Sequence, residues 1–216
     1  MTSTIQAQPI AVEEGARFFE IAVKHFVMDP TGIPAESCLA CAAWMAGTLL
    51  FRLEVNPEID APRGSIVLNE GVNQRLPELA HFVTKHASYG MAPDPDIDRA
   101  NPKGSSPKLR FSLADTQDIL DPIYLSYAKR SDLTAEQTLQ AAVLATALLA
   151  GKARRVLGLA LVTHIALHCM SEASKTVARR PQKHDEYEEH LWRFNSVLPK
   201  ITFLQRVRRS FRQLLH

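Results

Sequence analysis

The stretch SCLACAAWMAGTLLF, Ser37–Phe51, decides the fold of this chain. It carries no charged side chain, and its Ala, Gly, Cys and Thr residues are spread over several faces of the helix that it would form. A helix without a polar face is buried, so we predict a central helix from Pro34, which suits a first helical turn, to about Leu53. The run is shorter than the ~18–20 apolar residues of a bilayer-spanning helix, which favours burial inside a protein.

Two further uncharged runs have the same character, Gln137–Gly151 and Val156–Ser171. Thr134 and Gln137 form a capping-box pattern that opens the first of these helices. The second is expected from about 153 to 180 and is apolar on nearly all sides. With the central helix, these two predict the core of a single all-α domain, a bundle of about seven helices.

Amphipathic spacing predicts the other helices. They are expected at 11–28, 76–87, 112–129, 183–197 and 199–216. Residues 1–10 are expected to be a flexible arm, and 88–110 a long Pro- and Gly-rich loop. The domain would therefore cover 11–198, followed by a basic amphipathic helix over 199–216.

Three local patterns leave alternatives. Ile66–Leu68 fits a short strand or a first helical turn, and we expect the turn because no partner strand is visible. Gly151 is expected to end the helix that Thr134 opens. Arg154 and Arg155 would be unfavourable at a helix N-terminus. The helix that Thr134 opens and the helix expected from about 153 could therefore be one continuous helix.

Charge is divided unevenly along the chain. Residues 1–150 hold 12 Lys/Arg and 18 Asp/Glu, a net charge of −6, whereas residues 151–216 hold 13 and 5, a net charge of +8. The C-terminal basic residues are Arg206, Arg208, Arg209 and Arg212. We expect the last helix to dock on the acidic body or on another subunit, with an anionic lipid or nucleic acid as the alternative partner.

The number of cysteines and the sequence of the N-terminus help to predict the cellular compartment. Three cysteines without framework spacing do not fit a secreted disulfide scaffold. Residues 1–15 have neither a basic start nor an apolar core, so they do not fit a secretory signal. A cytoplasmic protein is therefore expected.

The pair Cys38-Leu39-Ala40-Cys41 is a candidate redox site. Cysteines three apart lie on one helix face, and a nearby helix N-terminus stabilises a thiolate. The pair resembles the helical Cys-x-x-Cys of the carboxymuconolactone decarboxylase and alkylhydroperoxidase-D-like group, which implies peroxidase chemistry. In that group a His follows closely, whereas Trp44 and Met45 stand here. The alternative, which we favour, is two small buried residues in an Ala-rich helix.

His164 and His168 are a candidate metal site, because histidines one helical turn apart can share one ion. The spacing resembles DinB-like helical bundles, which implies a third His from an earlier helix, His81 or His25. Glu172 continues the same face. Because the helix around the pair is apolar, we favour partly buried imidazoles with a structural role.

These observations predict a function only in outline. Three uncharged helices are difficult to cover within one subunit of this size, so we expect a non-catalytic helical interaction protein that self-associates and needs no cofactor. The alternatives are a thiol-redox protein that uses Cys38 and Cys41, and a metal-dependent enzyme that uses His164 and His168.

Overall fold

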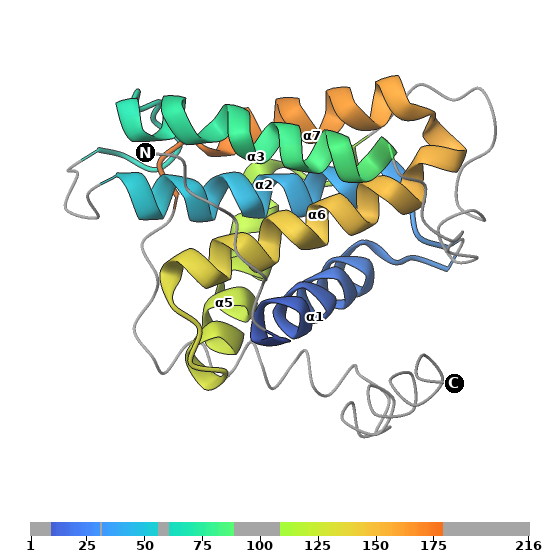
Figure 1. Ribbon diagram of the computed structural model, residues 1–216, viewed down its shortest axis with the longest axis horizontal. Coiled ribbons are helices and arrows are strands. Elements are labelled where there is room, and N and C mark those ends of the chain that lie inside the picture. The colour runs from blue at the N-terminus through green and yellow to red at the C-terminus, as the bar shows by residue number, and fades with distance from the viewer. Residues whose placement is uncertain (1–9, 31, 56–60, 89–108, 179–216) are drawn as a thin grey trace. The chain divides into compact units, whose positions relative to one another are not determined.

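Six helices are present in the part of the chain that the computed structural model describes, which is residues 10–30, 32–55, 61–88 and 109–178 (Figure 1). They are α1 (Ile10–Val27), α2 (Ala35–Glu54), α3 (Glu70–Ser88), α5 (Leu113–Arg130), α6 (Ala135–Leu157) and α7 (Leu159–Ala173). All of these residues belong to one compact unit, 1–181. The predicted all-α bundle is confirmed.

Helix α2 is the centre of this bundle. Every residue from Ala35 to Phe51 is buried, as the absence of charge in this run predicts. Its most extensive neighbours are α7 and α6, and α5 and α1 also pack against it (Figure 1). A fully buried Leu or Phe contributes roughly 1.5–3 kcal/mol, so this helix supplies much of the hydrophobic stabilisation. Of the three helices predicted to form the core, α2 is buried from Ala35 to Phe51 and packs most extensively against the other two, α6 and α7.

Side-chain caps define the starts of α5 and α6. The Ser112 hydroxyl accepts a hydrogen bond from the Asp115 backbone N–H, and the Asp115 carboxylate accepts one from the Ser112 N–H in return. Thr134 and Gln137 form the same reciprocal pair at α6, which confirms the predicted capping box. Each pair satisfies backbone donors that the first turn of a helix leaves without partners.

The break between α6 and α7 lies at Gly158, so the prediction that Gly151 ends the helix is wrong. Gly151 is buried inside α6, which continues to Leu157. Gly158 has φ 78° and ψ 153°, a conformation that side chains other than glycine rarely adopt. Arg154 thus falls in the last turn of α6, where a cation is favourable, and donates hydrogen bonds to the carbonyls of Ala87 and Ser88 at the end of α3.

The segment before α3 is extended, so the prediction of a helical turn at Ile66–Leu68 is wrong. The Val67 N–H donates to the Lys175 carbonyl at 2.7 Å, and the Val177 N–H donates to the Ser65 carbonyl at 2.9 Å. This antiparallel pairing joins positions more than 100 residues apart and explains why no local pattern revealed it. Helix α7 ends at Ala173, short of the expected 180: Ser174 and Lys175 form a turn, and the chain then pairs through Thr176 with Ile66.

Helix α3 begins at Glu70, six residues before the position that we expected, and Pro77 lies inside it. The Asn69 side chain accepts a hydrogen bond from the Val72 N–H at 3.1 Å and so caps the first turn. Asn69 also donates to the Glu54 carbonyl at the end of α2. The cap and this tertiary contact together outweigh the weak apolar pattern of residues 70–75.

Several predicted segments lie outside the described residues. They are the 1–10 arm except Ile10, most of the 88–110 loop, the 183–197 helix and the basic 199–216 helix with Arg206, Arg208, Arg209 and Arg212.

Candidate functional site

The Cys38 and Cys41 thiols are both buried in α2, and neither forms a disulfide. The nearest polar neighbour recorded for Cys41 is the Thr116 hydroxyl of α5, whose oxygen lies 3.4 Å from Sγ. That hydroxyl also lies 2.9 Å from the Ser112 carbonyl, the stronger acceptor. Cys41 therefore receives little stabilisation for a negative charge.

Burial raises the pKa of Cys41 to about 12. The hydrogen bond from the Thr116 hydroxyl acts in the opposite direction, and the nearby Asp115 carboxylate adds to the rise. Cys169 of α7 behaves in the same way: burial raises its pKa to about 12, with smaller contributions from Glu172 and Cys41. A reactive cysteine needs the opposite shift and access to solvent. The packing of α2 against α7 thus places these thiols where thiolates are unfavourable.

His164 and His168 lie on the solvent side of α7, and both are exposed. Their rings are nearly parallel, with an interplanar angle of 11° and centroids 6.0 Å apart. The expectation that these imidazoles are partly buried is therefore wrong. The cause is that the described helices cover only part of the circumference of α7, so its uncharged sequence does not make it a fully buried helix.

The histidines that we considered as third ligands lie on other helices. His81 is exposed on α3, and His25 is half-buried on α1, where burial lowers its pKa. Glu172 follows His168 by one turn, but its carboxylate accepts a hydrogen bond of 2.8 Å from the Trp44 indole N–H. Within the residues described, no three His, Cys, Asp or Glu side chains converge on one point that could hold a metal.

Comparison with protein-family models, with curated proteins and with solved structures finds no match.

The most distinctive surface of the described chain is the outward face of α7. We define it as the exposed and half-buried residues between 159 and 171. They are Leu159, Ala160, Leu161, Thr163, His164, Leu167, His168 and Ser171. No Asp, Glu, Lys or Arg occurs anywhere from Leu159 to Ser171, and Leu159 is 37% exposed. Solvent-facing helix surfaces are usually rich in charge, so an uncharged one of this length is unusual.

A second apolar feature belongs to the extended segment that pairs with the end of α7. Ile66 and Leu68 are 75% and 76% exposed. They alternate with half-buried Val67 and Asn69, as expected for an extended chain with one face toward the protein.

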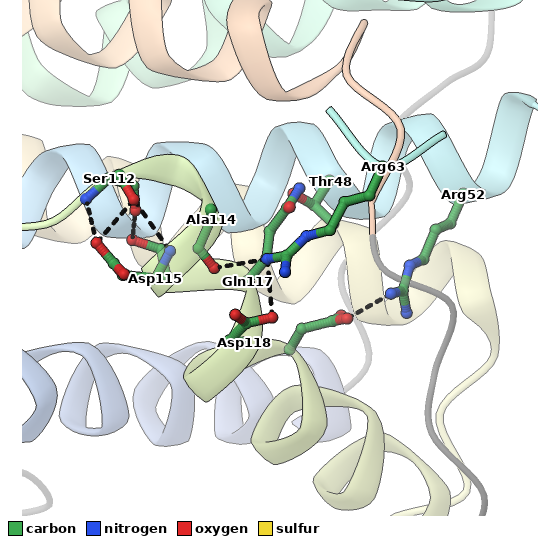
Figure 2. A network of polar contacts seen from close by, with 10 residues as sticks. Thr48, Arg52, Arg63, Ser112, Ala114, Asp115, Gln117 and Asp118 are labelled. Carbon is green, nitrogen blue, oxygen red and sulfur yellow. Dashed lines mark hydrogen bonds and ion pairs between the residues drawn. The ribbon is translucent and has the colours of Figure 1, made fainter. Parts of the chain in front are cut away.

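A polar network between α2 and α5 was not expected from the sequence. The Gln117 amide donates to the Thr48 hydroxyl at 3.0 Å, and Arg63 reaches the Ala114 carbonyl and the Asp118 carboxylate (Figure 2). Arg52 forms an ion pair with the buried Asp121. The sequence feature that could have predicted this network is Asp121, a carboxylate between Leu120 and Ile123 on the inward side of an amphipathic helix.

Asp121 is the most perturbed carboxyl group in this network. Burial raises its pKa to about 6, although the charge and hydrogen bond of Arg52 act in the opposite direction. Its second carboxylate oxygen has no hydrogen-bond partner. These properties are typical of a buried ion pair that costs desolvation energy.

No helix among the described residues is both long and apolar enough to span a membrane.

Proposed function

We propose that this protein is a non-catalytic helical interaction protein that self-associates through the outward face of α7. The observation that carries the proposal is the uncharged, solvent-facing run from Leu159 to Ser171. Two copies can bring such a face together without charge repulsion, and a face that meets itself gives a closed two-fold dimer. Half-exposed Leu161 and Leu167 would supply the apolar area that is removed from water.

The geometry of the thiols favours this proposal over the thiol-redox alternative. Catalytic cysteines have depressed pKa values and accessible sulfur atoms, whereas Cys38 and Cys41 are buried and the pKa of Cys41 is about 12. The nearby residues Trp44 and Met45 offer no general base. We keep the cytoplasmic location that the sequence predicts as part of the proposal.

The metalloenzyme alternative is less well supported. Catalytic zinc sites have three protein ligands and an open position, and the described residues do not bring three together. His164 and His168 lie on an exposed helix face rather than in a cleft.

The test is the mass of the full-length protein in solution, measured by light scattering or sedimentation velocity at micromolar concentration in the presence of a chelator. A monomer has a mass of 24.0 kDa, and we expect about twice that value. Leu159→Glu should shift the protein toward the monomer, because a charge would have to be buried at the contact. Glu is compatible with the first turn of α7, so the fold should be retained.

Ile119→Glu is the matched control. Ile119 is a large apolar residue on α5 with similar exposure, 44% against 37% for Leu159. It should leave the mass unchanged. A wild-type mass of 24 kDa, or an equal effect of the two substitutions, would refute the proposal.

A further inference from the structure

The two imidazoles on α7 are arranged as a potential chelate. His164 and His168 lie on successive turns of one helix, both rings are exposed, and the rings are nearly parallel at a centroid separation of 6.0 Å. Residues four apart on a helix are neighbours on its surface. By contrast, Nδ1 of His86 on α3 lies 2.9 Å from the Phe82 carbonyl of its own helix, so that ring is held by the backbone.

A pair of neutral imidazoles selects a certain class of ion. Imidazole suits Zn²⁺, Cu²⁺ and Ni²⁺, whereas Mg²⁺ and Ca²⁺ prefer oxygen ligands. Zn²⁺ usually takes four ligands in a tetrahedral arrangement, and one helix supplies two of them here. Within the described residues no third ligand joins the pair, so a complete site needs groups from elsewhere.

We propose that His164 and His168 bind a divalent transition metal ion together with the same two histidines of a second copy. The pair lies in the middle of the uncharged outward face of α7, so two copies that meet through this face bring their pairs together. A two-fold axis through the ion relates the two pairs and completes a four-histidine tetrahedral site. This inference rests on the proposed self-association and adds a metal ion to the contact between the two copies.

The surrounding charges are compatible with a bound cation. No Lys or Arg lies on α7 between Leu159 and Ala173. The single acidic residue of this helix, Glu172, lies one turn beyond His168, and the Trp44 indole holds its carboxylate. A carboxylate at this position lowers the electrostatic energy of a divalent ion without serving as its ligand.

The experiment uses the full chain and Zn²⁺ or Ni²⁺ alone. Metal binding is measured by calorimetry or by elemental analysis after dialysis, and mass is measured by sedimentation velocity with metal and with a chelator. We expect about one ion for every two chains. At concentrations low enough for the metal-free dimer to dissociate, we also expect a larger dimer fraction when metal is present. His164→Ala and His168→Ala should each weaken binding at least about tenfold and remove the effect of metal on the mass.

His81→Ala is the control, because His81 is also exposed on a helix but has no His one turn away. It should bind metal as the wild type does. Binding that survives both α7 substitutions would overturn the inference, as would one ion per chain without a change in mass, which would place the remaining ligands in the same chain. The chelator arm tests self-association separately: a dimer that persists with the chelator and takes up no metal when Zn²⁺ or Ni²⁺ is added supports the proposed function while refuting the metal site.

Discussion

Gly47 of α2 lies directly against the backbone of α7 at Met170. A β-carbon at position 47 would lie 2.3 Å from the Met170 carbonyl oxygen and 2.8 Å from the Ala173 β-carbon. The absence of a side chain at this one position therefore sets how closely the two central helices approach. The contact also depends on Ser174, whose backbone N–H donates to the same carbonyl and ends α7.

Gly47→Ala should destabilise the protein although alanine is the better helix former. The added methyl group cannot be accommodated unless α7 moves away from α2, and overpacking of this kind costs about 1–3 kcal/mol or more. Gly15→Ala is the graded comparison, because its β-carbon would meet the Ala141 side chain at 3.1 Å, a milder contact. Urea denaturation of both variants should rank Gly47→Ala as the less stable, and a cost at Gly47 no larger than that at Gly15 would contradict the predicted packing.

Asp121 should make stability depend on pH in a defined window. The ordinary pKa of this group is 3.8 and burial raises it to about 6, so between these values the folded protein binds a proton that the unfolded chain releases. The stability that this proton contributes is fully present below about pH 4 and is lost as the pH rises to about 6. The measurement is the free energy of unfolding of the wild type and of Asp121→Asn at each pH. The value for the wild type minus the value for the variant should fall by up to about 3 kcal/mol between about pH 4 and about pH 6.

Arg52→Gln provides the check on this prediction. The guanidinium group holds the pKa of Asp121 down, so its removal should extend the window to higher pH. A difference between wild type and Asp121→Asn that is flat from about pH 4 to about pH 6 would show that the folded and unfolded states titrate alike.

The thiols should react slowly in the folded protein. Cys38, Cys41 and Cys169 are buried, so a thiol reagent at neutral pH should label them at least about a hundredfold more slowly than in the urea-unfolded chain. Ser131→Cys, which places a thiol at an exposed position after α5, is the internal standard and should be labelled rapidly. Rapid labelling of Cys38 in the wild type would instead favour the thiol-redox alternative.

Gly158→Ala should destabilise the junction of α6 and α7 through the backbone alone. No atom lies within 4 Å of the position that a β-carbon would occupy, so a steric clash is not expected. The cost arises from φ 78° and should be about 1–3 kcal/mol. An unchanged urea midpoint would mean that the chain turns at another residue, or that the two helices are continuous.

The sequence alone determined the helical class, the central position of α2 and the start of α6. These features depend on short-range properties of the sequence. A helix formed by a run without charge has no side that favours water. The capping box of Thr134 and Gln137 needs no partner from another helix. The same reasoning located α1 and α5 to within a residue or two.

Only the tertiary structure decided which sides of the helices are covered and where α7 ends. The sequence of α7 is uncharged throughout, yet His164 and His168 are exposed because neighbours surround only part of the helix. The chain leaves α7 through a turn and is extended at Thr176 because Ile66 pairs with it there. Asp121 is in an ion pair because Arg52 of another helix reaches it. The pairing at Thr176 and the ion pair of Asp121 depend on partners 110 and 69 positions away. Periodicity within one segment carries no information about such a partner.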